Sequence, residues 1–293
     1  MPTNSDRFAG FVGGFLAVAA PCLSFASTPA LLETAYSSAW KQRGAVYKQP
    51  SAQDLASVKK IFVQLLRGTN TASVAADARV LGWQLDSQAR NGQTWHVMAE
   101  MPGQASGRGL YAFSSGGKHA VQAPHVPTDG LTGEILLGYA QDGLPRAMAW
   151  NTVPRKGGDL AHLDHTYLIA FSRAFAEVHP SERILQLHGF DAERRRTPEA
   201  GTAAAIVSAG HTNPSDTLRA AVRCMRRALE PQTRLYGVNV RELGGTTNSV
   251  LHALQRDRFD GFIHVEMNLS LRERLVAGSQ ERLALFECLG GSQ

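Results

Sequence analysis

Histidine and carboxylate side chains follow short apolar runs at several places in the 293-residue sequence. His125 comes just after such a run, His188 directly ends the run 184–187, and Glu266 lies near the end of the alternating run 262–268. In open α/β sheets, ligands bind beyond the carboxyl ends of the strands. We therefore expect these side chains to form one site.

Two neutral imidazoles and one carboxylate are a usual set of zinc ligands, and they leave one position open for water. Zinc lowers the pKa of that water towards about 7, and a nearby base then makes hydroxide available for attack on a carbonyl that the metal polarises. We predict His125 and His188 as ligands and Glu266 as the base. Asp129 and Glu134 compete for the third ligand position. We favour Asp129, because it can share a loop with His125, whereas Glu134 is expected on the following helix.

Arginine is the side chain best suited to hold a substrate carboxylate, through two parallel charged hydrogen bonds. Arg155 is the first candidate for this role, and Arg272 and Arg274 come next. Asp159 and His162 follow the same strand end as Arg155 and complete the predicted substrate-binding set.

Other roles for these residues stay open. A lone histidine after a strand is often a hydrogen-bonding loop residue, and Glu266 could be a surface residue or the partner of Arg272. His264 shares the strand parity of Glu266 and is an alternative ligand. The segment 244–248 could offer backbone N–H groups to an anion, although a tight turn explains it as well.

A serine hydrolase is a second enzymatic hypothesis. The segment 206–210 carries Ser208 and resembles a nucleophile elbow, but Ile206 stands where the first glycine is expected. The sequence contains no HExxH, Walker-type or GxGxxG motif, so nucleotide cofactors have no support.

The regular part of the chain alternates short apolar runs with helical stretches, which is typical of an α/β sheet. Residues 51–67 have the apolar spacing of an amphipathic helix, and residues 69–100 suggest irregular strands at an edge of the sheet. We expect one domain over residues 27–293, with strands near 110–113, 147–153, 184–187, 203–207, 235–240 and 262–265 and clear helices at 168–178 and 216–229.

Residues 8–25 form an almost entirely apolar or small, uncharged run after Arg7, and Ser24 to Ala26 supply a plausible cleavage site. This pattern predicts a signal peptide over residues 1–26. A membrane anchor is the alternative, since the run approaches the length needed to span a bilayer. A lipoprotein at Cys22 is disfavoured, because Pro21 precedes it. Cys224 and Cys288 would remain after cleavage and could form a disulfide in an oxidising compartment.

The composition is that of an ordinary globular protein, with 43% hydrophobic and 19% charged residues, and it argues against disorder, collagen-like repeats or a coiled coil. The net charge of +5 is spread along the chain, apart from Arg194 to Arg196. It indicates a mild preference for anionic ligands, and we expect no nucleic-acid partner.

The order of His125 with a nearby acid, the strand ending Gln186-Leu187-His188-Gly189 and the late Glu266 resembles the zinc carboxypeptidase and N-formylglutamate amidohydrolase-like group. The resemblance covers roughly residues 110–275. It implies an α/β/α sandwich around a mostly parallel mixed sheet, a single zinc ion, and cleavage of amide bonds near carboxylates. The compact His-x-x-Glu of the carboxypeptidases is absent, since position 128 is Thr128, and this leaves the third ligand open.

These observations predict an exported, zinc-dependent hydrolase that cleaves an amide or peptide bond of a small carboxylate-bearing substrate. The expected location is periplasmic or secreted, with no stable membrane association once the signal is cleaved. The alternative from another class is a metal-free periplasmic binding or accessory protein that holds an anionic ligand through Arg155.

Overall fold

The computed structural model describes residues 1, 31–41, 43, 44, 46–69, 71–90, 92–126 and 128–291. Apart from Met1, the predicted signal peptide lies outside these residues, and so does Cys22. No helix in the described ranges has the length and apolar character needed to cross a membrane.

The described chain alternates strands and helices along most of its length. The strands are β1 (Trp83–Arg90), β2 (Gln93–Glu100), β3 (Leu110–Ser114), β4 (Lys118–Ala123), β5 (Pro145–Trp150), β6 (Ile184–Gly189), β7 (Ala205–Ser208), β8 (Thr233–Leu235) and β9 (Phe262–Met267). The α-helices are α1 (Leu31–Lys41), α2 (Ala52–Leu66), α3 (Thr71–Val80), α4 (Thr132–Asp142), α5 (Tyr167–Val178), α6 (Pro198–Gly201), α7 (Asp216–Ala228), α8 (Ser249–Arg256), α9 (Leu269–Ala277) and α10 (Ser279–Gly290). Two 3-10 turns are η1 (Arg155–Gly157) and η2 (Ala192–Arg194).

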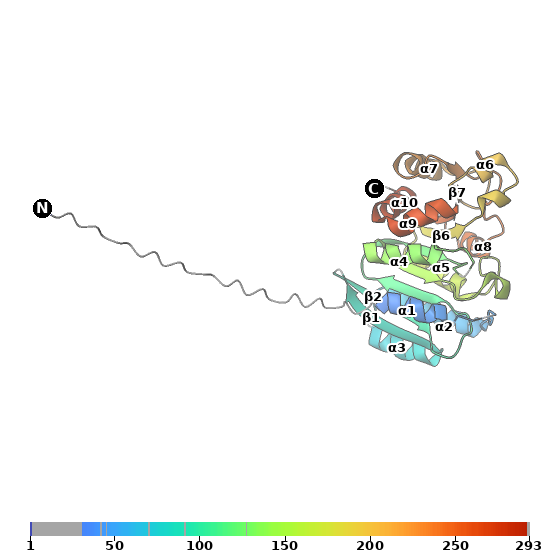
Figure 1. Cartoon of the computed structure of the whole chain (residues 1–293). Helices are drawn as coiled ribbons and strands as arrows, with labels where there is room; N and C mark the ends of the chain where they lie inside the picture. Colours follow the sequence, from blue (N-terminus) through green and yellow to red (C-terminus); the bar gives the residue numbers. More distant parts are fainter. Residues whose placement is uncertain are drawn as a thin grey trace.

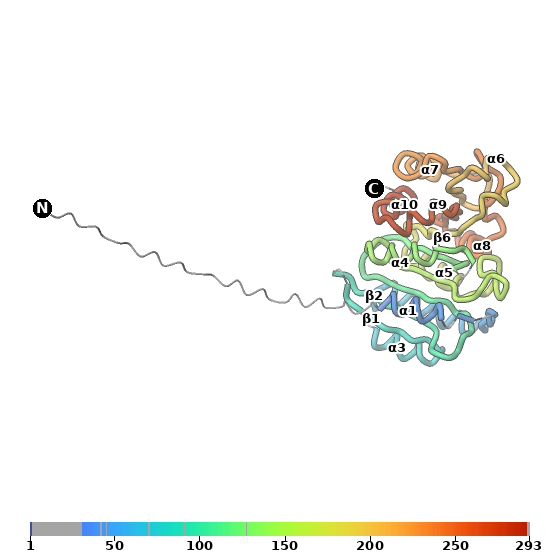
Figure 2. The backbone as a smooth tube through the Cα atoms, in the orientation of Figure 1, coloured from blue at the N-terminus to red at the C-terminus, as the bar shows by residue number. Residues whose placement is uncertain are grey.

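The nine strands form one mixed sheet in the order β1-β2-β3-β5-β4-β6-β9-β7-β8, which runs from α3 at the bottom of Figure 1 towards α7 at the top. The four central strands β5, β4, β6 and β9 are parallel, and antiparallel strands flank them on both sides. The carboxyl ends of β4, β6 and β9 therefore meet at one edge of the sheet. Figure 2 shows α1 beside β1 and β2, whereas the C-terminal α10 lies near α7 and α4.

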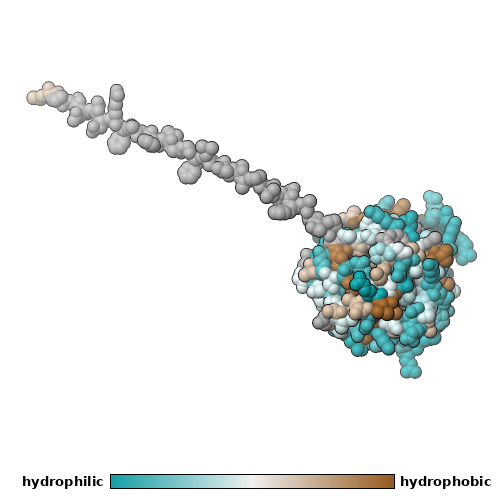
Figure 3. Space-filling view, turned by 90° about the horizontal axis from the view of Figure 1, so that it is seen from below, coloured by the Kyte–Doolittle hydropathy of each residue, from teal (hydrophilic) through white to brown (hydrophobic). Residues whose placement is uncertain are grey.

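Helices cover both faces of the sheet. Alternate strand residues point to opposite faces, so β6 sends Leu185 and Leu187 into one hydrophobic core and Ile184 into the other. The first core packs against α1, α4, α7, α9 and α10, and the second against α2, α3, α5 and α8. Seen from below, the surface mixes hydrophilic residues, residues of intermediate hydropathy and small separated hydrophobic patches (Figure 3). This layered mixed α/β architecture confirms the predicted fold class.

The predicted elements are mostly present, with three differences. Residues 69–100 form α3 and the regular hairpin β1–β2 rather than irregular strands alone. The strand expected over residues 235–240 ends at Leu235, because the chain turns there: Gly237 has a φ of 86° and its N–H donates to the carbonyl of Val240. The sequence patterns also missed β4, the strand that leads to His125.

Cys224 on α7 and Cys288 on α10 form a disulfide, with their Cα atoms 5.4 Å apart. The sequence left open whether these two residues meet. The bond ties together two helices that cover the same face of the sheet.

Candidate metal centre

A tight turn after β4 brings His125 and Asp129 together. The backbone N–H groups of Thr128 and Asp129 both donate to the carbonyl of His125, each at 2.7 Å. The hydroxyl of Thr132 donates to the carbonyl of Asp129 at 2.7 Å, where α4 begins. His188 joins them from the end of β6, the strand next to β4.

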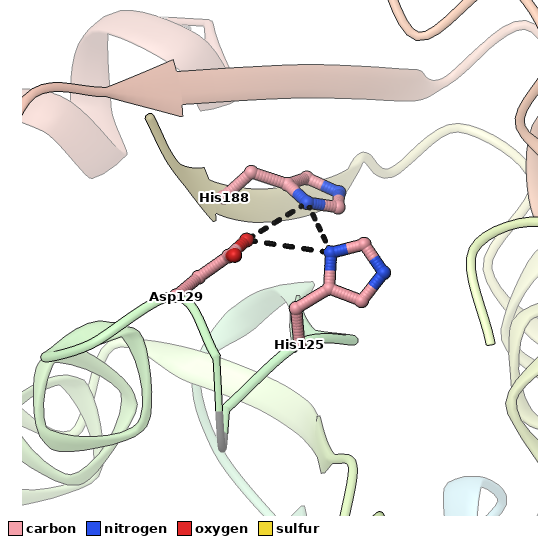
Figure 4. Close-up of side chains that lie close together, drawn as sticks. All are labelled: His125, Asp129 and His188. Atoms are coloured by element: carbon pink, nitrogen blue, oxygen red, sulfur yellow. Dashed lines mark hydrogen bonds and ion pairs between the residues drawn. The ribbon is translucent and has the colours of Figure 1, made fainter. Parts of the chain in front are cut away.

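The three side chains form a buried cluster (Figure 4). Nδ1 of His125 lies 3.1 Å from Nδ1 of His188. Oδ2 of Asp129 lies 3.4 Å from the first of these nitrogens and 3.3 Å from the second. His125, Asp129 and His188 are 2%, 8% and 3% exposed.

The outer nitrogen of each imidazole faces an acceptor. Nε2 of His125 lies 2.8 Å from Oδ1 of Asp159, and Nε2 of His188 lies 3.0 Å from Oε1 of Gln186. A carboxylate or amide oxygen only accepts, so both outer nitrogens carry a hydrogen, and in their neutral forms the two rings present Nδ1 lone pairs to each other. A cation between them removes this repulsion, and metal-ligating histidines in general donate their second N–H to such oxygens. The donor set of two imidazole nitrogens and one carboxylate fits a divalent transition metal.

Burial and the close contacts among these ionisable side chains shift their pKa values. Burial and the neighbouring His264 lower the pKa of His188 to about 4. Burial also acts to lower the pKa of His125, but its bonds to Asp129 and Asp159 outweigh burial and raise it. For Asp129, burial acts to raise the pKa, but its close contacts with the two histidines outweigh burial and hold the pKa well below its ordinary range. Asp129 is therefore ionised, as a metal ligand must be.

The carboxylate of Asp159, whose side chain is 27% exposed, is held by three side chains of the protein. Besides His125, its carboxylate contacts Nε of Arg155 at 2.8 Å and Nδ1 of His162 at 3.0 Å. Nε2 of His162 in turn lies 3.1 Å from Oγ1 of Thr247. Asp159 therefore orients His125, and it is not among the residues that line the cleft. The sequence predicted that Asp159 contacts the substrate. The structure differs, because the oxygens of Asp159 already contact three side chains of the protein.

Glu266 lies beside His188 in the sheet. The two residues are register partners on β9 and β6, so their side chains leave the same face. Nε2 of His264 contacts Oε1 of Glu266 at 3.3 Å, and the ring of His264 lies 4.5 Å from that of His188. Burial acts to raise the pKa of Glu266, but the hydrogen bond from His264 and the charges of His188 and His264 together outweigh burial, and the pKa is lowered.

A cleft of about 1040 Å³ opens onto the cluster. Arg155, His162 and Arg272 line it, together with His125, Asp129, His188 and Glu266. Arg272 is only 7% exposed, and its donors reach the carbonyls of Gly130 and Asn268. No carboxylate within the described part of the chain pairs with Arg272, which leaves a buried positive charge beside the cleft.

Two predicted residues lie apart from the cluster. Glu134 is exposed on α4, where its Oε1 accepts a hydrogen bond from the hydroxyl of Tyr36 at 3.3 Å, so it does not reach the histidines. Ser208 is buried, and its hydroxyl donates to the carbonyl of Gly244 at 2.7 Å and accepts from the N–H of Gly210 at 2.8 Å. It does not line the cleft, and the structure offers no support for Ser208 as a nucleophile.

Sequence reasoning missed the polar residues that support the cluster from behind. Gln122, Gln186 and Asn248 are buried and hydrogen-bonded to one another. The sequence did contain one sign of them. Gln186 is a polar residue in an otherwise apolar strand, and because it precedes His188 by two positions, the two side chains lie on one face.

No protein-family model matches the sequence, and no curated protein matches it significantly. Solved structures that resemble it include three proteins named as candidate metallopeptidases, from Shewanella amazonensis SB2B, Shewanella denitrificans OS217 and Shewanella baltica OS155. Their sequence identities are 8%, 10% and 10%, and their TM-scores are 0.36, 0.34 and 0.38. The matches cover 74%, 74% and 84% of this chain and 90%, 87% and 98% of theirs. Similarity at this level assigns no activity, so the function has to be derived from the site of this chain.

Proposed function

We propose that this protein is a metal-dependent hydrolase and that Nδ1 of His125, the carboxylate of Asp129 and Nδ1 of His188 hold a zinc ion. The observation that carries the proposal is the pair of Nδ1 atoms facing each other at 3.1 Å beside the carboxylate of Asp129, whose pKa is lowered. Zinc suits this set, because it takes neutral imidazole and carboxylate ligands and keeps a position open in catalytic sites.

When bound, zinc polarises a carbonyl and lowers the pKa of water. Glu266 supplies the base. Its Oε1 is held by His264, and its Oε2 has no hydrogen-bond partner among the described residues. The lowered pKa keeps this carboxylate ionised at neutral pH, so Oε2 is the atom that accepts a proton and later returns it to the leaving amine.

Arg272 supplies the recognition of an anion in this proposal. It is buried, it lines the cleft, and no carboxylate among the described residues forms a direct ion pair with it, although Asp129, Glu266 and Glu273 are near enough to act on its charge. A substrate carboxylate would compensate that charge through charged hydrogen bonds. Arg155 also lines the cleft, but Asp159 already pairs with it, so we place the anion at Arg272.

The finer assignment is an enzyme that cleaves an amide or peptide bond of a small carboxylate-bearing substrate, as the resemblance to the zinc carboxypeptidase and N-formylglutamate amidohydrolase-like group implies. We also propose that it works in the periplasm or outside the cell. The disulfide between Cys224 and Cys288 supports this location, because such bonds persist in oxidising compartments.

Hydrolysis of N-acyl dipeptides tests the proposal. Purified protein is freed of metal with a chelator, supplied with zinc, and assayed for release of the terminal amino acid. We expect turnover with zinc and none without it. Stabilisation by the anionic dipeptide with no turnover in either state would instead support a metal-free binding protein.

A further inference from the structure

A row of buried polar side chains crosses the sheet behind the metal centre. Gln122 on β4 and Gln186 on β6 are register partners and leave the same face of the sheet. Both have no exposed surface, and Nε2 of Gln186 donates to Oε1 of Gln122 at 3.1 Å. Two glutamines in a hydrophobic layer are costly unless their hydrogen bonds are satisfied, so the orientation of each amide is decided by its partners.

On one side of the row, the backbone of α5 sets the orientation of the Gln122 amide and, through it, that of Gln186. The hydroxyl of Ser172 donates its single hydrogen to the carbonyl of Leu168 at 2.7 Å, so its oxygen is left to accept. It accepts from Nε2 of Gln122 at 2.7 Å. The oxygen of Gln122 therefore faces Gln186 and takes the hydrogen of its Nε2. That leaves Oε1 of Gln186 pointing to the other side.

The start of α8 independently sets the orientation of the Gln186 amide. Oδ1 of Asn248 caps this helix by accepting from the N–H groups of Val250 and Leu251 at 3.0 and 3.2 Å. The amide nitrogen of Asn248 must then face away from the helix, and it donates to Oε1 of Gln186 at 2.5 Å. Both anchors give the same result: an oxygen of Gln186, not its nitrogen, stands 3.0 Å from Nε2 of His188.

We propose that Gln186 is a positioning residue that holds His188 in the Nε2–H tautomer and so keeps its Nδ1 lone pair directed at the metal centre. The consequence of this tautomer, metal binding, rests on the function proposed above. The tautomer itself is a property of the metal-free chain. Gln122 and Ser172 on one side and Asn248 on the other keep the amide of Gln186 from rotating. A rotated amide would offer a donor to Nε2 and move the imidazole hydrogen to Nδ1, where it blocks a ligand.

The ¹⁵N chemical shifts of the imidazole in metal-free protein report the tautomer directly. Histidine-selective ¹⁵N labelling at neutral pH, with His188→Asn to assign the signal, is expected to show hydrogen on Nε2 of His188. The Gln186→Met variant removes the acceptor and is expected to give a mixture of tautomers or mainly Nδ1–H. Gln186→Glu keeps an acceptor oxygen and is expected to retain Nε2–H.

Gln122→Met is the matched control, because it makes the same change in the same buried row without touching His188. Asn248 still holds the oxygen of Gln186 there, so the tautomer is expected to remain. Zinc affinity is expected to fall about 10- to 100-fold in Gln186→Met and less in Gln122→Met.

A wild-type His188 with its hydrogen on Nδ1 overturns the proposal, even if no Gln186 variant folds. An unchanged tautomer in folded Gln186→Met overturns it as well. A protein with the expected tautomers that binds no zinc would contradict the proposed function and leave the role of Gln186 in place.

Discussion

His125 and His188 face each other through their Nδ1 atoms at 3.1 Å, while each donates its Nε2–H to an oxygen behind it. Asp159 supplies that oxygen for His125, and Gln186 supplies it for His188. The two rings come from the ends of neighbouring parallel strands, β4 and β6, and the arrangement brings their lone pairs to one point next to Asp129. The chemistry we propose depends on this convergence.

Replacement of the base separates catalysis from metal binding. Glu266→Gln keeps the shape of the side chain but cannot accept the proton, so we expect kcat for N-acyl dipeptides to fall about 10²- to 10⁴-fold. Zinc affinity should stay within a few-fold of wild type. Glu199→Gln is the control, since Glu199 is exposed on α6 and does not line the cleft. Full activity in Glu266→Gln would remove this residue from the mechanism.

Loss of the buried guanidinium should weaken recognition of anionic substrates. Arg272→Met removes a charged hydrogen-bond donor, and we expect KM for a carboxylate-bearing dipeptide to rise about 10- to 100-fold. An amidated dipeptide, which lacks the carboxylate, should show a much smaller change. Arg194→Met tests a rim arginine whose side chain is 81% exposed, and it should have little effect. Equal losses for both substrates would show that Arg272 does not bind the carboxylate.

The disulfide should contribute to stability but not to the site. It joins residues 64 positions apart, and the loop-closure model gives about 4 kcal/mol for a loop of this size. We expect a reductant to lower the urea midpoint of the wild type and to leave a Cys224→Ser/Cys288→Ser variant unchanged. Zinc affinity should be the same in both, because α7 and α10 do not line the cleft. A wild-type midpoint that does not respond to complete reduction would contradict this expectation.

Glu242 ties together two segments of the cleft wall. Its carboxylate accepts from the backbone N–H of Thr197 at 2.9 Å, from the hydroxyl of Thr197 at 2.8 Å and from the N–H of Arg196 at 3.2 Å. Burial acts to raise the pKa of Glu242, but these hydrogen bonds outweigh it and lower the pKa. A lowered pKa means that the stabilisation is complete above the ordinary value of 4.5 and is lost as the pH falls through the folded value.

Glu242→Gln should therefore be less stable than wild type at neutral pH, by about 1–3 kcal/mol, and the difference should shrink in acid. Urea unfolding at a series of pH values measures it, with Glu199→Gln as the control variant. A difference that stays constant or grows as the pH falls would show that the charge of Glu242 is not what holds the two segments.

Much of the fold could be predicted from the sequence, because its signals are local. The apolar spacing of residues 51–67 predicted α2, which begins after the capping residue Ser51 and ends at Leu66. β4 was missed, since Lys118 to Ala123 is short and carries polar residues at Lys118, His119 and Gln122. The two buried ones have partners far along the chain: His119 accepts from the N–H of Arg183, and Gln122 is hydrogen-bonded to Ser172 and Gln186.

The candidate site could also be predicted only in part. The positions of His125, His188 and Glu266 after apolar runs predicted a shared edge of the sheet, and the structure brings all three to the cleft. The partner of each histidine could not be predicted. Asp159 reaches His125 from the loop after β5, and Asn248 reaches Gln186 from the start of α8, so both contacts depend on strand order and on the way that loops cross the sheet.

Zinc stoichiometry measured on three purified proteins tests the central claim most directly. The wild type is compared with His125→Ala/His188→Ala and with His211→Ala/His252→Ala, which removes two exposed imidazoles instead. Each protein is stripped of metal, titrated with zinc in a calorimeter and analysed for bound metal after gel filtration. We predict one tightly bound zinc ion per chain in the wild type and in the exposed-histidine variant, and none in His125→Ala/His188→Ala. Equal zinc in all three proteins, or no zinc in the folded wild type, would contradict the metal centre.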